Sequence, residues 1–262
     1  MMPAQTQTTY SRLTLDVRPP IARMFLSHPP LNIIDVAMME ELAHALAEIE
    51  AHSGISIIVI SGDGNSFSAG VDVAAHAPDK VESMLAKFHK VIRALVCTKK
   101  ITIASIRGHC LGGGAELSMV CDMAYSTESA QWGFPEIKLG CYPPVAATAL
   151  ASLVGQKRAA DLILTGRTIS GAQAAEMGLA NRAVPDGDLT AVVEESVQRL
   201  ASLSSASLAI TKKAIYAWDS MHFDKGLARA EKIYLEELMK TEDAQEGLNA
   251  FLEKRRPKWK GK

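Results

Sequence analysis

The sequence predicts an α/β protein whose mainly parallel sheet is followed by a helical C-terminal region. Two β-branched runs, starting at Ile57 and Ile101, each lead into a glycine-rich loop and then into a helical pattern. This order is typical of parallel strands joined by crossover helices. Beyond Pro144 the pattern becomes mostly helical. Because ligands of parallel sheets bind at the carboxyl ends of the strands, the two glycine loops are the predicted location of a site.

The elements before and between these runs follow from apolar periodicity. Residues 11–27 alternate apolar and polar side chains around Pro19-Pro20, which predicts a β-hairpin. Apolar residues then recur at helical spacing after Asp35, a predicted N-cap. A second helix is expected from Val81 to Leu95. The two strand, glycine loop and helix units therefore form a weak internal repeat.

Amphipathic stretches fill the C-terminal part, at Leu189 to Leu203, Ser207 to Trp218 and Phe223 to Lys240. Helices with little sheet to cover usually pack on the preceding domain or on another subunit. We therefore expect a core domain over residues 1–200 and a helical oligomerisation region over residues 201–262.

Composition argues for a small-molecule partner. The chain has 262 residues, 48% of them hydrophobic, and its net charge of −1 gives no electrostatic reason to expect nucleic acid or an anionic membrane. No apolar run approaches the ~20 residues of a membrane span, and we see no targeting pattern. The four cysteines form no CxxC pair and no cluster with histidine, which predicts buried free thiols and no metal site. We expect a cytoplasmic protein.

Two glycine segments offer backbone N–H groups to a ligand. In the loop "SFSAGVDV", Gly70 permits an exposed backbone, so that the N–H of Val71 can face a ligand. In "LGGGAEL", each glycine costs about 1 kcal/mol against alanine inside a helix, so we expect something to approach the backbone closely. A ligand oxygen could there reach the N–H of Gly113 at the positive end of the helix dipole. Together, Val71 and Gly113 would form an oxyanion hole.

Two carboxylates lie near these segments, Glu116 in the first turn of the predicted helix and Glu136 in "FPEIKLG". Taken alone, Glu116 fits a role in capping and Glu136 a charge on a surface loop. Beside a predicted oxyanion hole, the pair instead indicates general acid and base chemistry.

These residues lie in motifs by which the chain resembles the crotonase, or enoyl-CoA hydratase/isomerase, superfamily over nearly its whole length. The motifs are "LSHPPLNIID", "IIVISGDGNSFSAGVDV", "IASIRGHCLGGGAELSMVCDMAYSTESAQWGFPEIKLG", "LTGRTISGAQAAEMGLANRAVP" and "EGLNAFLEKRRPKW". The resemblance implies a crotonase-like spiral of ββα repeats, whose helical C-terminal part builds a homotrimer or a dimer of trimers. It also implies an acyl-CoA thioester substrate, with coenzyme A as part of the substrate and no separate cofactor.

The resemblance further implies roles for single residues. The N–H groups of Val71 and Gly113 would hold the thioester carbonyl oxygen, Glu116 would activate water, and Glu136 would exchange a proton with the substrate carbon. Both glutamates match those of hydratases, which favours water addition over isomerase or hydrolase chemistry. Further expected contacts with the substrate or its CoA part are Ala69, Gly70, Asp72, Val73, Gly112, Trp132, Phe134 and Tyr142.

The acyl pocket departs from the hydratase pattern. A glycine-rich turn resembling PGAGG is common there, but this chain has "CYPPVAATA", in which Pro143 and Pro144 stiffen the segment. Trp132, Phe134 and Tyr142 bracket Glu136, which suggests a flat, cyclic acyl group, although such aromatics also pack loops and subunit contacts. "FSAGVDVAAH" and "LGCYPPVAATAL" resemble the cyclohexa-1,5-diene-1-carbonyl-CoA hydratases. A histidine in the first of these segments either borders this pocket or faces solvent.

Three other interpretations rest on fragments. Gly62 and Gly64 are spaced like the first two glycines of a dinucleotide-binding GxGxxG loop, but Phe67 stands where the third glycine would be. The tail "EKRRPKWKGK" has six basic residues in ten positions, which fits RNA binding, a solvated terminus or a contribution to CoA phosphate binding. The third interpretation is a subunit that binds CoA thioesters without catalytic activity. Loss of Glu116 or Glu136 would have supported it, and both residues are present.

Overall fold

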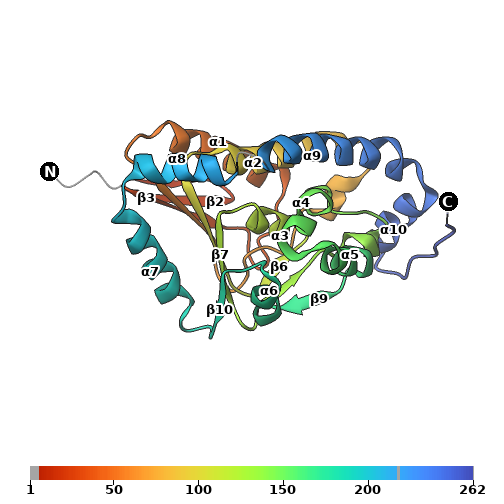
Figure 1. The fold of residues 1–262 in the computed structure, drawn as a ribbon. Helices are drawn as coiled ribbons and strands as arrows, with labels where there is room; N and C mark the ends of the chain where they lie inside the picture. Colours follow the sequence, from red (N-terminus) through yellow and green to blue (C-terminus); the bar gives the residue numbers. More distant parts are fainter. Residues whose placement is uncertain (1–5, 217–218, 262) are drawn as a thin grey trace.

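The computed structural model describes residues 6–216 and 219–261, and Figure 1 shows their arrangement. A seven-stranded sheet has the order β1-β2-β3-β4-β5-β7-β10, and a three-stranded sheet has the order β6-β8-β9. The strands are β1 (Thr6–Thr9), β2 (Leu13–Arg18), β3 (Ile21–Leu26), β4 (Ile57–Gly62), β5 (Ile101–Ile106), β6 (His109–Leu111), β7 (Met123–Thr127), β8 (Gln131–Gly133), β9 (Thr168–Ser170) and β10 (Arg182–Val184). The helices are α1 (Val36–Ala51), α2 (Val81–Cys97), α3 (Gly113–Met119), α4 (Pro144–Val154), α5 (Gln156–Thr165), α6 (Gly171–Met177), α7 (Leu189–Ala201), α8 (Ser205–Ile215), α9 (Asp219–Glu236) and α10 (Glu242–Leu252), with 3₁₀ turns η1 (Val73–His76), η2 (Pro135–Leu139) and η3 (Leu238–Lys240).

The predicted N-terminal elements are confirmed. Strands β2 and β3 pair antiparallel, which is the hairpin, and Asp35 caps α1 by accepting the N–H of Met38 at 2.8 Å. Strands β4 and β5 are parallel, with Ile57 directly opposite Ile101. The two residues that begin the internal repeat are therefore neighbours in one sheet.

The repeat is also visible in the smaller sheet. After β5 the chain enters β6, and after β7 it enters β8, which pairs with β6 in parallel. The loop after β4 joins the same layer, because Ser68 forms a parallel bridge with Cys110. Each turn of the chain thus gives one strand to the large sheet and one segment to the small one. This is the expected spiral of repeats.

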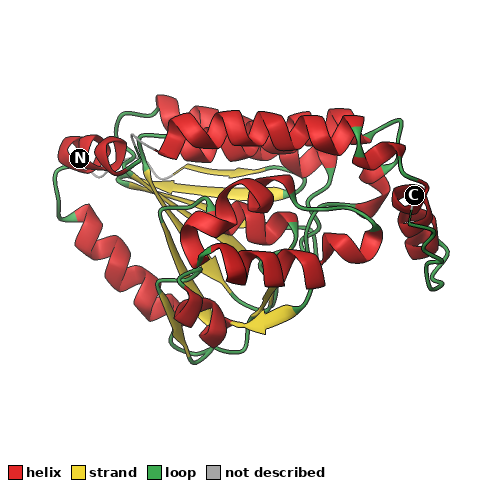
Figure 2. Cartoon of the chain, turned by 45° about the vertical axis from the view of Figure 1, so that its right-hand side comes forward, coloured by secondary structure: helices red, strands yellow, loops and turns green. Residues whose placement is uncertain are grey.

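Strand β4 is apolar at successive positions because both of its faces are buried. Ile58 and Ile60 belong to the main core, while Ile57 and Val59 belong to a second cluster beneath α7. A strand covered on both faces is apolar at successive positions. The alternation of its side chains between the two clusters is therefore visible only in the three-dimensional structure. Figures 1 and 2 show the helical layer on one side of the sheet and α7 on the other.

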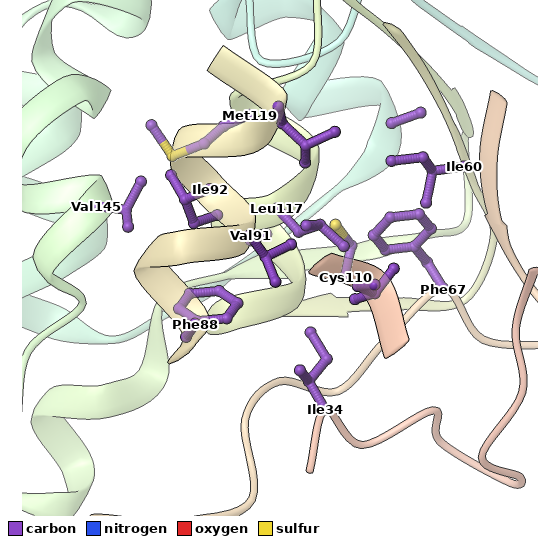
Figure 3. Close-up of a cluster of buried hydrophobic side chains, with 14 of the residues drawn as sticks. Ile34, Ile60, Phe67, Phe88, Val91, Ile92, Cys110, Leu117, Met119 and Val145 are labelled. Carbon is purple, nitrogen blue, oxygen red and sulfur yellow. The ribbon is translucent and has the colours of Figure 1, made fainter. Parts of the chain in front are cut away.

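The main core joins helices from distant parts of the chain. Figure 3 shows Phe88, Val91 and Ile92 of α2 gathered with Leu117 and Met119 of α3. All five side chains are at most 7% exposed. Since α3 carries two of the glycines singled out in the sequence, this packing fixes one wall of the site.

The C-terminal helices differ in detail from the prediction. The helix expected from Ser207 to Trp218 is α8, which ends at Ile215, and Trp218 lies outside the described residues. Helix α9 packs on α4 and α2, and Tyr234 within it belongs to the main core. The region over residues 201–262 therefore completes the core of its own chain, and its role in oligomerisation stays a prediction. Two short strands beyond Pro144, β9 and β10, were not predicted, because three residues are too few to show alternation.

The cysteines are all free, as expected, but they differ in burial. Cys110 and Cys141 are buried, whereas Cys97 is exposed at the last residue of α2, which corrects the expectation that every thiol is covered. Among residues 6–216 and 219–261, no helix combines the length and apolar character needed to cross a membrane.

A buried ion pair attaches α8 to the sheet. The Nζ of Lys212 lies 2.7 Å from Asp122 Oδ2 and also donates to the carbonyl oxygen of Lys100 at 2.8 Å. The same Asp122 oxygen accepts hydrogen bonds from the backbone N–H and hydroxyl of Thr102. Because both side chains are nearly inaccessible to water, each charge depends on the other for compensation.

We expect Lys212→Met to lower the free energy of unfolding by about 3 kcal/mol, since it leaves the Asp122 carboxylate buried and unpaired. Chemical denaturation measures the change. The double variant Lys212→Met with Asp122→Asn should be more stable than Lys212→Met alone. Lys213→Met, at an exposed neighbouring position, is the matched control. Equal losses in the Lys212 and Lys213 variants would contradict this account.

Candidate active site

One cavity of about 620 Å³ collects most of the residues predicted for the site. It lies between the loop after β4, helix α2, the start of α3, the turn η2 and helix α10. From the predicted set it is lined by Ala69, Gly70, Val71, Asp72, Val73, Gly112, Gly113, Glu116, Glu136 and Tyr142. His76 also borders it and is half-buried, so the alternative of a solvent-facing histidine does not hold.

The loop after β4 directs one N–H group away from the protein framework. The N–H of Ile34 donates to the carbonyl oxygen of Gly70 at 2.9 Å, and the N–H of Asp72 donates to the carbonyl oxygen of Ile34 at 3.1 Å. In such a bridge the residue between the two partners turns its own N–H to the other side. The N–H of Val71 therefore faces away from Ile34, and no described residue accepts it. Gly70 permits this path with φ +108°.

The glycines at the start of α3 allow three close approaches. A Cβ on Gly112 would lie 2.6 Å from Glu136 Oε1, and Gly112 itself has φ +51°. A Cβ on Gly113 would lie 2.6 Å from Val71 Cγ2 and 3.4 Å from the Val71 nitrogen. On Gly114 it would lie 2.7 Å from the carbonyl oxygen of Ser68. At each of the three positions a different neighbouring group thus leaves no room for a Cβ atom.

These approaches bring two unpaired N–H groups together. Gly113 is the first residue of α3, so its N–H has no acceptor within the helix. It lies beside the backbone nitrogen of Val71, whose N–H is also unpaired among the described residues. Two adjacent N–H donors in a cavity wall can stabilise negative charge that develops on a bound oxygen.

Glu116 caps a helix, but not the one that carries it. Its Oε1 accepts the N–H of Val145 at 2.8 Å and that of Ala146 at 3.0 Å, at the start of α4. Pro144, at the first helical position, has no N–H to contribute. Burial raises the pKa of Glu116 to about 7, although the two N–H groups act in the opposite direction. This carboxyl group is therefore about half ionised at neutral pH and mostly ionised above it.

Glu136 has a different environment. It projects from η2, its Oε2 is fully buried, and this oxygen has no hydrogen-bond partner among the described residues. Burial raises its pKa well above the ordinary value, and the nearby charge of Glu116 raises it further. Because Glu116 has two N–H donors and Glu136 Oε2 has none, the proton of the pair belongs to Glu136.

The aromatic residues around Glu136 separate into two groups, which corrects part of the sequence prediction. Trp132 and Phe134 are fully buried and do not line the cavity, so the alternative that they pack the protein interior holds for both. Trp132 lies in β8 and donates its Nε1–H to Ser126 Oγ at 3.0 Å. Tyr142 does line the cavity, with its hydroxyl donating to the carbonyl oxygen of Ala230 at 2.6 Å.

Several cavity residues were missed because they come from distant helices. Leu85 and Phe88 of α2, Tyr234 of α9 and Phe251 of α10 line the cavity. Helical periodicity predicted that α2 and α9 each bury a face, but it contains no signal for what that face contacts. No cluster of three or more metal-ligating side chains occurs within the part of the chain that the structure describes.

Comparison with known proteins agrees with this geometry. A model of the enoyl-CoA hydratase/isomerase family matches residues 17–262. The chain is 34% identical over 242 residues to a cyclohexa-1,5-dienecarbonyl-CoA hydratase of Thauera aromatica, covering 92% of this chain and 93% of the other. It is 33% identical over 255 residues to a probable enoyl-CoA hydratase of Rhizobium meliloti, covering 96% and 99%.

Solved structures give the same result. An enoyl-CoA hydratase/isomerase from Xanthobacter autotrophicus Py2 superposes with a TM-score of 0.85 at 30% identity, over 94% of this chain and 98% of that one. An enoyl-CoA hydratase from Mycobacterium avium subsp. paratuberculosis reaches a TM-score of 0.87 at 24% identity, over 96% and 100%, which shows the shared fold. The chain belongs to the enoyl-CoA hydratase/isomerase family.

Proposed function

We propose that this protein is a hydro-lyase that adds water to an α,β-unsaturated acyl-CoA thioester. The observation that carries the proposal is the presence of two buried carboxyl groups of unequal acidity beside two unpaired backbone N–H groups in one cavity. Family membership alone leaves isomerase and hydrolase reactions open. Both carboxyl groups are present and they differ in protonation, which favours addition of water.

In the proposed mechanism the N–H groups of Val71 and Gly113 bind the thioester carbonyl oxygen. Negative charge grows on this oxygen when a nucleophile adds to the conjugated double bond. Fixed donors in a dry cavity stabilise that charge by several kcal/mol, because they need no reorganisation during the reaction.

The two glutamates complete the proton transfers. The Glu116 carboxylate takes a proton from water while the water oxygen bonds to the conjugated carbon. Glu136 then gives its proton to the carbon of the enolate, and the carbonyl double bond is restored. One water has been added, and the proton has moved from Glu136 to Glu116. Return of a proton to Glu136 through solvent restores the starting state.

We further propose that the acyl group is a cyclic diene. The first support is the Thauera aromatica relative, which is named for such a substrate. The second is a part of the cavity wall in which Tyr142 and Tyr234 lie with ring centroids 5.2 Å apart and to which Pro143 and Pro144 also contribute. Flat rings and fixed proline backbones suit a flat, rigid acyl group better than a flexible chain.

Product analysis tests the reaction and the acyl group together. We expect the purified protein to add one water to cyclohexa-1,5-diene-1-carbonyl-CoA, measured as a mass gain, and to act poorly on crotonyl-CoA. Hydration of crotonyl-CoA alone would make the substrate a linear acyl group. A rearrangement without mass change, or release of free CoA, would replace the hydratase with an isomerase or a hydrolase.

Each glutamate should be required for turnover. We expect Glu116→Gln and Glu136→Gln to lower kcat by roughly 100-fold or more, with a smaller effect on substrate affinity, because each removes a proton-transfer group. Glu82→Gln, at an exposed position of α2, is the matched control. Near-normal turnover in either cavity variant would refute the two-carboxylate mechanism.

The pH dependence should follow Glu116. Because the pKa of this group lies at about 7 and its ionised form is the base, we expect kcat/KM to rise as pH increases from 6 to 8. The rise should be about tenfold, as the ionised fraction grows through the pKa. At higher pH, loss of the Glu136 proton should lower the rate again. A flat profile from pH 6 to 8 would contradict the assignment of Glu116 as the base.

A further inference from the structure

Tyr234 presents a polar group that the proposed mechanism does not use. Its side chain is 1% exposed and forms part of the cavity wall. Its hydroxyl group is buried and has no hydrogen-bond partner among the described residues. The thiol of Cys141 and the carboxyl group of Glu136 are its polar neighbours. A buried hydroxyl without a partner costs free energy, so this one calls for an explanation.

The neighbouring tyrosine makes the contrast clear. The ring of Tyr142 meets that of Tyr234 edge to face, and both rings line the same cavity. Helix α9 supplies the carbonyl oxygen of Ala230 as an acceptor for the Tyr142 hydroxyl. No described residue supplies an oxygen or nitrogen acceptor for the Tyr234 hydroxyl. A phenylalanine at position 234 would provide the same ring without the unpaired hydroxyl.

The chemistry of this hydroxyl group limits what it can bind. Burial raises the pKa of Tyr234 far above its ordinary value, so the group stays protonated at physiological pH. A neutral phenol donates its hydrogen to an oxygen or nitrogen acceptor. The Cys141 thiol is the acceptor that lies beside this hydroxyl group. Sulfur is only a weak acceptor, so it satisfies the phenol less well than an oxygen atom would.

We propose that Tyr234 is a specificity-determining residue, whose hydroxyl donates a hydrogen bond to an oxygen atom carried by the acyl group. The site would therefore prefer acyl-CoA thioesters that bear a hydroxyl group on the part held between Tyr234 and Glu136. The inference rests on the proposed function for the identity of the acyl group.

Binding to unreactive ligands tests this preference without turnover. The probes are cyclohexanecarbonyl-CoA and its 3-hydroxy and 4-hydroxy derivatives, with dissociation constants measured by calorimetry. We expect the wild-type protein to bind at least one hydroxy derivative more tightly than the parent thioester. In Tyr234→Phe this preference should fall about tenfold, as expected for loss of one hydrogen bond, while affinity for the parent should change little. An unchanged preference in Tyr234→Phe, or none in the wild type, would overturn the proposal.

Tyr142→Phe is the matched control, because its hydroxyl is already committed to Ala230. Its overall affinity is free to change, but its preference for the hydroxy derivative should equal that of the wild type. Loss of the preference in Tyr142→Phe as well would show that the ring pair, and not the Tyr234 hydroxyl, sets it.

Thermal unfolding gives an independent readout. Since Tyr234→Phe removes an unpaired buried hydroxyl, we expect its Tm without ligand to equal or exceed that of the wild type. A clearly lower Tm would mean that the hydroxyl has a structural partner, against the proposal.

The proposed function and the proposed role of Tyr234 can be refuted independently of each other. Absence of dienoyl-CoA hydration with the hydroxyl preference intact would refute only the proposed function, and the reverse result would refute only the role of Tyr234.

Discussion

The close approach of the α3 N-terminus to the loop after β4 is the contact on which the site depends. Gly112, Gly113 and Gly114 face Glu136, Val71 and the Ser68 carbonyl oxygen respectively, and each position lacks room for a Cβ. Protein interiors are packed too densely to absorb such a collision without moving the backbone. The glycines therefore do more than permit flexibility. They set the distance between two unpaired N–H groups and bring Glu136 against the same backbone.

The second constraint is electrostatic, and it distinguishes two chemically identical side chains. Glu116 accepts two N–H groups at the start of α4, whereas Glu136 Oε2 has no donor within the described chain. Burial disfavours the charged form of both, and the charge of one disfavours the charge of the other. The result is that Glu116 ionises at a lower pH than Glu136. Helix α4 thus contributes to the site although neither glutamate is on it.

The C-terminal helices complete the cavity and connect it to the rest of the chain. Helix α10 packs so closely on η2 that a Cβ on Gly247 would collide with the carbonyl oxygen of Leu139. Helix α9 places Tyr234 in the cavity wall, and the carbonyl oxygen of Ala230 in the same helix accepts a hydrogen bond from the Tyr142 hydroxyl. A division at residue 200 separates two regions of the sequence, but Leu227 and Tyr234 belong to the same core as α1 to α3. Tyr234 and Phe251 thus bring this later part of the chain into the cavity wall.

The sequence by itself determined the N-terminal hairpin, the parallel pairing of the repeat and the backbone and carboxyl groups that line the cavity. These follow from local chemistry, because apolar periodicity, a capping aspartate and runs of glycine act over a few residues. It did not determine which aromatic residues face the cavity. Trp132 and Phe134 flank Glu136 in sequence but point into the core, whereas Tyr234 reaches the cavity from α9. Only the tertiary structure decided this, because the direction of a side chain depends on which helix covers it. The same holds for the difference between Glu116 and Glu136, since the N–H groups that lower one pKa lie about thirty residues away along the chain.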